Sequence, residues 1–315
     1  MHGVRIPPRR RTVEWPTVGL GIVIYAGWGG LTYFHDAIPL WLLMPLGGWF
    51  VAWHASFQHE VIHGHPTRSR GLNRLIGGWP LLLWLPYERY RISHLVHHRD
   101  ERLTDPLDDP ESYYWIPEEW ERLGFWRKLI IRVNATFLGR VTIGPAWTIG
   151  RFLAGEMVAM LRGDRLARRI WTWHLVEAAV VLAWIVLVCG MHPLIYFLAF
   201  VYPGTALMLV RSFAEHRAES EVDERTAIVE NAPLMGLLFL YNNLHAVHHE
   251  NPMIPWYEIP AWYRANRERL LRENGGLVYD GYLDVARRYL LTAHDTPVHP
   301  HGRAPEAAAA PHRAA

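Results

Sequence analysis

The sequence predicts an all-α integral membrane protein, with four transmembrane helices in two hairpins and a cytoplasmic helical cap that carries clustered histidines. Three observations support this fold class. Half of the 315 residues are hydrophobic, long apolar runs occur in two closely spaced pairs, and many of the 19 histidines cluster between or after these pairs. Histidine acts mainly as a metal ligand, a proton carrier or a pH switch, so the clusters are expected to be functional.

Each hairpin consists of two apolar runs joined by a short turn. The first pair covers residues 17–34 and 38–57, and neither run contains Asp, Glu, Lys or Arg. The second pair covers residues 174–191, with Glu177 near the start, and 194–210. About 20 apolar residues cross a hydrocarbon core about 30 Å thick as a helix. We therefore expect four spans, with the abundant Trp and Tyr near the membrane interfaces.

The distribution of arginine orients these spans. Arginines are frequent in residues 1–16, 61–102 and 162–169, whereas the two tight turns at 35–39 and 190–193 contain no Lys or Arg. Positively charged segments remain on the cytoplasmic side of a membrane. Both turns are therefore expected outside, and both termini and every histidine cluster inside.

Two further apolar stretches are not expected to cross the membrane. Residues 75–86 are too few, and residues 133–149 are interrupted by Gly139, Gly144 and Pro145. Short apolar segments of this kind lie at the interface or re-enter the membrane from one side. We expect this arrangement for both.

The chain is expected to have three parts. Residues 1–16 form a basic N-terminal tail, and residues 17–291 form the membrane domain, which ends in surface helices over 256–291. Residues 292–315 are low in complexity and are predicted to be disordered, so His299 is expected to be incidental.

Charge and cysteine content exclude several function classes. A formal net charge of only +2 gives no support for nucleic-acid binding. Cys189 is the single cysteine, which rules out an intrachain disulfide, a CxxC redox pair and a cysteine-ligated iron–sulfur centre.

Three histidine clusters have the spacing of metal ligands. The first is HEVIHGH, with His59, His63 and then His65, the second is HLVHH at 94–98, and the third is HAVHH at 245–249. Positions i, i+3 and i+4 share one face of a helix, so each cluster can direct two or three imidazoles at one point.

One more histidine follows the fourth apolar run, in the stretch RSFAEHR. The total of nine exceeds the six positions of an octahedral ion. It suits two metal ions that keep some positions for water or oxygen. The candidate ligands are His59, His63, His94, His97, His98, His216, His245, His248 and His249.

Two other function classes need fewer histidines. HEVIH matches the HExxH motif of zinc peptidases, in which Glu60 would be the general base. A haem or metal carrier without enzymatic activity is a third class. Both leave most of the clustered histidines without a role, and imidazole itself suits zinc, copper and iron alike.

The three clusters, together with HHENPMIPWYEIP after the last one, resemble the histidine boxes of the membrane fatty acid desaturase superfamily. This superfamily includes acyl desaturases, hydroxylases, carotenoid ketolases and alkane monooxygenases. The resemblance covers about residues 20–290. It implies a four-helix membrane stem whose cytoplasmic cap holds two iron ions on the nine histidines and uses O₂ as co-substrate.

Ligating histidines need acceptors for their second N–H group. In stearoyl-type desaturases an Asn four residues before the extra histidine holds a water; Ser212 stands at that position, and Asn242 or Asn243 is a candidate replacement. Residues expected to surround the ligands are Glu60, His65, Ser212, Asn242, Asn243 and Glu250, and further nearby carboxylates are Asp100, Asp105, Asp108, Asp109 and Glu215.

The resemblance implies the introduction of a double bond into a fatty-acyl or similar lipid-like chain. Hydroxylation, ketone formation and alkene-forming decarboxylation remain alternatives, because they differ only in where the substrate carbon lies relative to the oxidant. The chain shows no flavin, nicotinamide, haem or iron–sulfur fingerprint. We therefore expect a separate electron-donor protein of the ferredoxin, rubredoxin or cytochrome type, and the Arg-rich segment 162–169 is a candidate docking patch.

Overall fold

The computed structural model describes residues 13–99 and 102–300. Most of the basic tail predicted for residues 1–16 lies outside this range. The same holds for Asp100 and for residues 301–315 of the predicted C-terminal tail.

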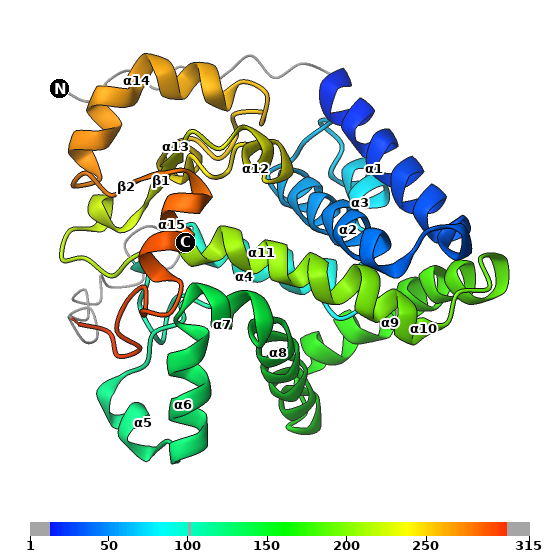
Figure 1. Cartoon of the computed structure of the whole chain (residues 1–315), viewed down its shortest axis with the longest axis horizontal. Coiled ribbons are helices and arrows are strands. Elements are labelled where there is room, and N and C mark those ends of the chain that lie inside the picture. Colours follow the sequence, from blue (N-terminus) through cyan, green and yellow to red (C-terminus); the bar gives the residue numbers. More distant parts are fainter. Residues whose placement is uncertain (1–12, 100–101, 301–315) are drawn as a thin grey trace, which may run out of the picture.

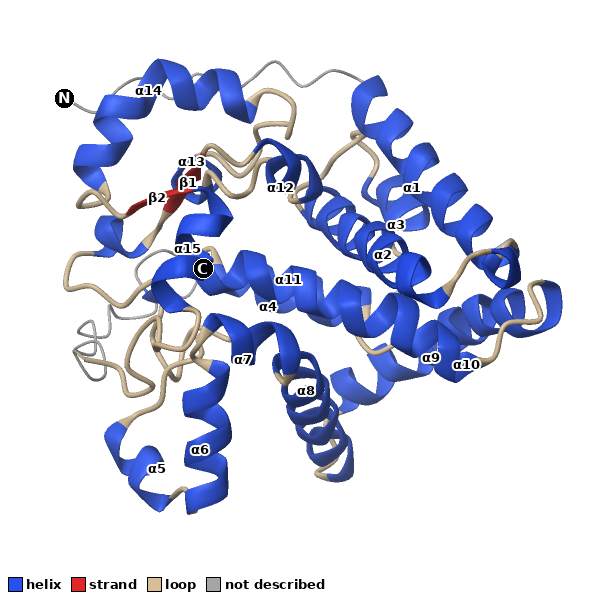
Figure 2. Ribbon diagram, in the orientation of Figure 1, coloured by secondary structure: helices blue, strands red, loops and turns tan. Residues whose placement is uncertain are grey.

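Helices form most of the described chain (Figures 1 and 2). The first group consists of α1 (Trp15–Tyr33), α2 (Leu40–Ile62), α3 (Arg70–Gly77), α4 (Tyr87–His97), α5 (Pro117–Arg122), α6 (Phe125–Asn134), α7 (Phe137–Thr142) and α8 (Gly144–Leu161). The second group consists of α9 (Arg165–Ala183), α10 (Pro193–Tyr196), α11 (Tyr202–Glu215), α12 (Pro233–Leu238), α13 (His245–Glu250), α14 (Ile259–Glu273) and α15 (Gly281–Tyr289). Two π-helical turns, Trp184–Val188 and Phe197–Val201, extend α9 and lead into α11.

The all-α prediction missed one small sheet. Strands β1 (Ile228–Glu230) and β2 (Val278–Asp280) pair in parallel, with Val229 opposite Tyr279 (Figure 2). Each strand has only three residues, which is too short for an alternating pattern to be visible in sequence. The pair ties the segment before α12 to the segment before α15.

Helices occupy all four predicted spans. α1 and α2 match the first pair of runs, and α9 to α11 match the second pair. Within the described residues, Arg165–Val188 and Pro193–Glu215 are long and apolar enough to cross a membrane by length and composition. α1 and α2 have 19 and 23 residues but do not meet the same criterion of length and hydropathy. Their Gly, Trp and polar residues lower the mean hydropathy of the helices.

Close helix packing holds the two hairpins together. α2 and α11 lie side by side at the centre of the molecule (Figure 1), where glycines replace larger residues. A Cβ atom on Gly48 would lie 2.7 Å from Cβ of Pro203, and one on Gly204 would lie 2.9 Å from a methyl group of Val51. Small residues allow helix backbones to approach, which is the main source of association between helices in lipid.

Residues 75–86, predicted to be an interfacial or re-entrant segment, do not form one continuous helix. They include the end of α3 and then a non-helical turn that is buried against the helices. The Tyr196 hydroxyl donates to the Leu81 carbonyl at 2.7 Å, and the Trp84 indole donates to Thr205 at 3.2 Å. Irregular backbone of this kind is tolerated at membrane depth only where protein covers it.

The stretch 133–149, predicted to be an interrupted apolar segment, is not one continuous helix. This stretch contains the end of α6, all of α7 and the start of the 18-residue helix α8. Pro145 lies in the first turn of α8, where its missing N–H leaves no hydrogen bond unmade. Gly144 and Pro145 therefore follow a break between two helices and begin the second one, whereas Gly139 lies inside α7. The buried residues of α8 are Gly144 and Pro145, whereas Leu161 at the other end is 75% exposed.

The C-terminal segment predicted to be disordered is ordered through residue 300. His294 lies 3.0 Å from the Tyr279 hydroxyl, and the His299 backbone N–H donates to the Trp115 carbonyl at 3.0 Å. Both histidines are buried, so His299 is a packing residue and not an incidental one. Sequence composition could not reveal this, because the partners come from distant segments.

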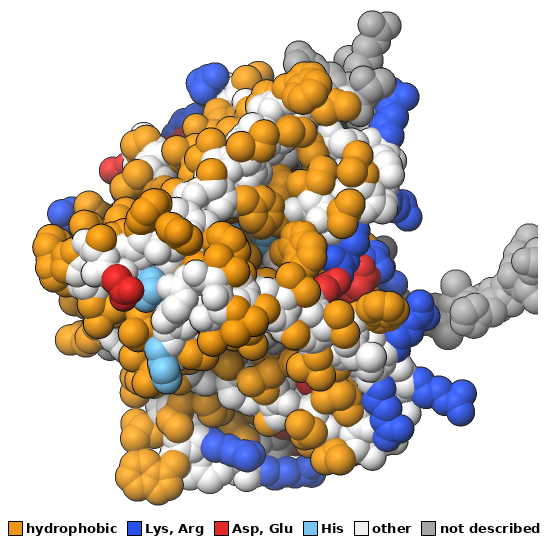
Figure 3. Space-filling model, turned by 90° about the vertical axis from the view of Figure 1, so that its right-hand side faces the viewer, with side chains coloured by type: hydrophobic (Ala, Val, Ile, Leu, Met, Phe, Trp, Pro, Cys, Tyr) orange, Lys and Arg blue, Asp and Glu red, His pale blue; other side chains and the backbone are white. Residues whose placement is uncertain are grey.

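Exposed apolar side chains cover much of the face in Figure 3, while Lys and Arg gather towards one edge. Among the exposed apolar residues are Trp41 on α2 and Leu187 at the end of α9. Water-soluble surfaces rarely carry apolar patches of this extent. A lipid environment accounts for them.

Gly48→Val should destabilise the α2–α11 contact, because its side chain must displace Pro203. Overpacking of this kind costs about 1–3 kcal/mol. The expected result is a lower thermal transition of the protein in detergent. Gly29→Val is the matched control, since no atom lies within 4 Å of a Cβ at Gly29. Equal transitions for the two variants would contradict the packing argument.

Candidate metal centre

Helix ends deliver the candidate ligands to one place. α2, α4 and α11 bring their C-terminal ends, with His63, His98 and His216 as C-cap residues, and the short helix α13 contributes its whole length. The C-terminal end of a helix carries the negative end of its dipole. Three such ends directed at one site favour a bound cation.

The nine histidines form two groups. Within each group, the nearest ring nitrogens all lie within 4.8 Å of one another. The first group is His59, His63, His94, His98 and His248, and the second is His97, His216, His245 and His249.

Distances within the groups match those between ligands of one ion. The Nε2 atoms of His94 and His98 are 3.0 Å apart, and Nε2 of His216 is 3.0 Å from those of His97 and His245. Two imidazoles bound at about 2.1 Å and at right angles would have nitrogens about 3.0 Å apart. The groups thus have the dimensions of two metal sites.

A metal would also satisfy a buried nitrogen. Nε2 of His59 is buried and has no hydrogen-bond partner among the described residues. A buried polar atom without a partner costs about 1–3 kcal/mol. His59 belongs to the five-histidine group, so a cation there would supply the missing contact. The residues present therefore fit two metal ions.

Outward-facing nitrogens are held by acceptors from the loop after α4 and from the protein backbone. Nδ1 of His94 donates to Glu111 at 3.1 Å, and Nδ1 of His97 donates to Asp109 at 2.9 Å. Nδ1 of His216 donates to a main-chain carbonyl at 3.2 Å. Such bonds fix the tautomer and turn Nε2 towards the metal.

Asn242 holds the third cluster. Its side-chain oxygen accepts from Nδ1 of His245 at 3.1 Å, and its amide lies 3.4 Å from Glu215. Leu240 and Tyr241, just before it, have positive φ angles of 50° and 59°. Such angles are uncommon outside glycine and persist only where surrounding structure enforces them. This strained turn places the Asn242 side chain next to His245, which it orients.

The pKa values of the clustered histidines differ. Burial lowers the pKa of His98 to about 2, and neighbouring His94 adds to this effect. Burial also opposes protonation of His97, but the carboxylates of Glu111 and Asp109 outweigh it and raise its pKa to about 9. Metal must displace the proton from such a ring, whereas the neutral rings are ready to bind.

Other residues expected near the ligands have their contacts elsewhere. The Glu60 carboxylate accepts from the backbone N–H of Trp256 at 3.2 Å, and the Glu250 carboxylate pairs with Arg269 at 2.8 Å. Ser212 donates to a carbonyl within its own helix. Nδ1 of His65 lies 2.7 Å from the Glu14 carboxylate, and the Asn243 amide donates to the Val229 carbonyl at 2.7 Å. The Asp105 carboxylate accepts from the backbone N–H of Leu107 at 2.8 Å. The Asp108 carboxylate pairs with Arg102 at 2.7 Å.

Glu111 was missed by the sequence analysis, although it contacts His94. It lies 13 residues beyond the HLVHH cluster in a loop with no regular period. Asp109 was one of several acidic residues in that stretch, and only the fold selects it. Thr104, with a positive φ of 69°, donates its N–H to Asp109 at 2.9 Å and so fixes the carboxylate beside His97.

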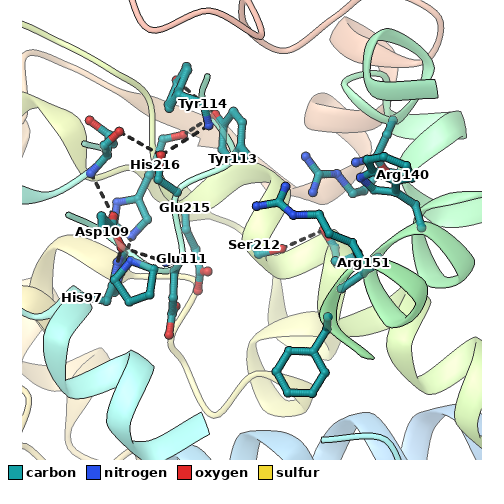
Figure 4. Close-up of a pocket in the computed structure, with 18 of the residues that line it drawn as sticks. His97, Asp109, Glu111, Tyr113, Tyr114, Arg140, Arg151, Ser212, Glu215 and His216 are labelled. Atoms are coloured by element: carbon teal, nitrogen blue, oxygen red, sulfur yellow. Dashed lines mark hydrogen bonds and ion pairs between the residues drawn. The ribbon is translucent and has the colours of Figure 1, made fainter. Parts of the chain in front are cut away.

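A cavity of about 410 Å³ opens beside the second group. His97 and His216 lie on one side of it, Arg140 and Arg151 lie on the other, and Ser212 lies between (Figure 4). Trp147, Phe152 and Leu209 also line the cavity. A volume of this size accommodates a small-molecule substrate.

The family is decided by comparison of the whole sequence with known proteins. The family model described as fatty acid desaturase matches residues 36–281, which include all nine histidines. The chain belongs to the fatty acid desaturase family. The resemblance seen in the histidine clusters is thus confirmed over most of the chain.

Curated relatives of this desaturase family member are distant. It is 24% identical over 231 residues to the sn-1 acyl-lipid omega-3 desaturase (ferredoxin) of Nostoc sp., covering 72% of this chain and 55% of that protein. It is 24% identical over 301 residues to the sn-1 oleoyl-lipid 12-desaturase of Arthrospira platensis, covering 84% and 79%. It is 20% identical over 225 residues to the beta-carotene ketolase of a Paracoccus species, covering 68% and 73%. The chain thus spans about half the length of the Nostoc relative.

Asp109→Ala should weaken metal retention at the second group, because His97 loses the acceptor that orients it. Losing such a partner typically lowers metal affinity by about 10–100-fold. The measurement is metal content of the purified protein during titration with a chelator. Asp108→Ala is the control, since Asp108 pairs with Arg102 at 2.7 Å. If the two variants release metal at the same chelator concentration, Asp109 does not support the site.

Proposed function

We propose that this protein is a membrane-embedded di-iron oxidoreductase that uses O₂ to introduce a double bond into a fatty-acyl or similar lipid-like chain. The observation that carries the proposal is the assembly of nine imidazoles in two adjacent groups beside a cavity. Family membership supports the lipid-modifying reaction class. Two iron ions on the two groups are the cofactor that this proposal requires.

The proposed ligands divide between the ions as the histidines divide in space. His59, His63, His94, His98 and His248 would hold one ion, and His97, His216, His245 and His249 the other. When bound, the irons supply oxidation of an unactivated C–H bond with O₂. The chain itself orients three of the imidazoles: Glu111 accepts from His94, Asp109 from His97 and Asn242 from His245.

We further propose four membrane spans with a cytoplasmic cap. α1, α2, α9 with its π-helical extension, and α10 to α11 are the spans. The Arg-poor turns at 35–39 and 190–193 would then lie outside. An even number of crossings returns both termini to the histidine side.

A ketolase is the second candidate, supported by similarity to the Paracoccus enzyme named beta-carotene ketolase. Hydroxylation and alkene-forming decarboxylation use the same type of site. The named acyl-lipid and oleoyl-lipid desaturases make double-bond formation the first choice.

The zinc peptidase alternative has less support from the geometry. Its general base would be Glu60, but this carboxylate is engaged by the backbone N–H of Trp256. His59 and His63 share their group with three further imidazoles, whereas catalytic zinc uses three protein ligands and one open position. These contacts support a two-metal site over a zinc peptidase site.

A separate electron donor is part of the proposal. The name of the Nostoc relative includes ferredoxin, which makes a small iron–sulfur protein the first candidate. The Arg-rich segment 162–169 comprises the turn between α8 and α9 and the first residues of α9. It remains the proposed docking patch, since opposite charges steer such encounters.

Purified protein should contain two iron atoms per chain and little zinc. Cells that produce it should accumulate an unsaturated lipid or hydrocarbon, detectable by mass spectrometry of extracts. His248→Ala is the control, because it removes a ligand of the first group and should abolish the product while the protein still inserts in the membrane. One zinc and no iron per chain would favour the peptidase instead.

A reporter fused after Ala315 should give a cytoplasmic signal, because four spans return the chain to its starting side. Reporters inserted near Asp36 and Met191 should report from the opposite side. A fourth reporter in the turn at 78–86 tests whether this buried segment crosses. An external signal from the Ala315 fusion would contradict the proposed topology.

A further inference from the structure

The cavity beside the second histidine group is lined by four carboxylates and by two arginines, Arg140 and Arg151. Each carboxylate has a partner within the protein. Asp109 contacts His97 at 2.9 Å, and Glu111 contacts His94 at 3.1 Å. Glu156 pairs with Arg89 at 3.0 Å, and Glu215 pairs with Arg211 at 2.9 Å.

Arg140 and Arg151, which face the same cavity, have no carboxylate within ion-pair distance in the described part of the chain. The Arg140 guanidinium lies 5.6 Å from the ring centroids of Tyr113 and Phe213, and that of Arg151 lies 5.6 Å from the ring centroid of Trp115. Aromatic faces hold a cation in place but leave its N–H groups available to an anion.

Arg140 is the unusual residue of this pair. It is only 8% exposed, and its buried Nε has no hydrogen-bond partner among the described residues. Burial lowers its pKa, in keeping with the lack of a neighbouring carboxylate. A charged group is almost never fully buried unless it is paired. Arg140 therefore has the features of a residue whose partner is a ligand.

The rest of the cavity suits an alkyl chain. Trp147, Phe152 and Leu209 form an apolar wall, and α8, which carries two of them, presents exposed apolar residues along its outer face. Figure 4 places the arginines across the cavity from His97 and His216. A molecule with one anionic end and one apolar tail would match both parts.

We propose that Arg140 and Arg151 bind the carboxylate of a free fatty acid, so that the substrate is the acid itself and not an ester or thioester. This inference rests on the proposed function and specifies its substrate class. The carboxyl group of an esterified acyl chain carries no charge, so it would leave both arginines without a carboxylate partner. The planar guanidinium fork binds carboxylates through two parallel hydrogen bonds.

The test is binding of sodium dodecanoate to the purified protein in a non-ionic detergent, by calorimetry, without O₂ or electron donor. Methyl dodecanoate and dodecyl phosphate are the comparison ligands. The acid should bind more tightly than the methyl ester. Arg140→Gln should weaken acid binding by about ten- to a hundredfold and leave ester binding unchanged, because only the charge-assisted bonds are lost. Arg140→Lys should restore part of the affinity.

Arg127→Gln is the matched control, since Arg127 is exposed on neighbouring α6 and is not among the residues that line the cavity. If Arg140→Gln is not recovered folded, Arg151→Gln at the exposed rim makes the same comparison. Equal binding of acid and ester by the wild type would overturn the inference, as would equal losses of both in the arginine variants. Tighter, arginine-dependent binding of dodecyl phosphate would also overturn it, in favour of a phosphate head group.

These outcomes are independent of the proposed reaction. Arginine-dependent binding of the acid, without any oxidised product in cells, would remove the proposed function and keep the inference. Oxidised products from a protein that binds acid and ester equally would support the proposed function and overturn the inference.

Discussion

The convergence of nine imidazoles, six of them buried and three half-buried, is the constraint on which the rest of the structure depends. Several rings are desolvated next to other rings, and two positive charges in such a place would repel strongly. Low pKa values, as at His98, keep most rings neutral in the absence of a metal. Neutral rings are the metal-binding form, so burial and ligation act in the same direction. The fold must then hold four separate segments in register around one centre.

The helix pair α2–α11 supplies that register. Glycines allow the two backbones to approach closely, and both helices end at the centre with a histidine cap. α4 and α13 add the other two clusters from segments that are 150 residues apart in sequence, as the contact between His98 and His248 shows. A close helix crossing in the stem therefore fixes the distance between ligands in the cap.

Acidic and basic side chains occupy different positions around the histidines. Glu111 and Asp109 face the outer nitrogens of α4, while Glu215 is neutralised by Arg211. Arg140 and Arg151, which line the cavity on the same side, have no acidic partner among the described residues. Acidic groups thus serve the ligands, and basic groups remain for what enters the cavity. This separation accounts for one site that can attract both a cation and an anionic substrate.

The sequence by itself determined the helical stem, the histidine clusters and the family. The length of an apolar run and the i, i+3, i+4 spacing of histidines are local properties, so they can be recognised without knowing which residues are in contact. The sequence also suggested Asn242 as a neighbour of the third cluster, since the two are three residues apart.

Tertiary structure decided what depends on distant partners. It divided the nine histidines into groups of five and four, which mixes rings from different clusters: His97 joins His216, while His94 and His98 join His59. It selected Glu111 and Asp109 from a loop without periodicity, and it placed Pro145 in the first turn of α8. It also left Arg140 buried without an acidic partner in the part of the chain that the structure describes. Each of these outcomes depends on which side chains meet across the fold, and spacing along the chain does not specify that.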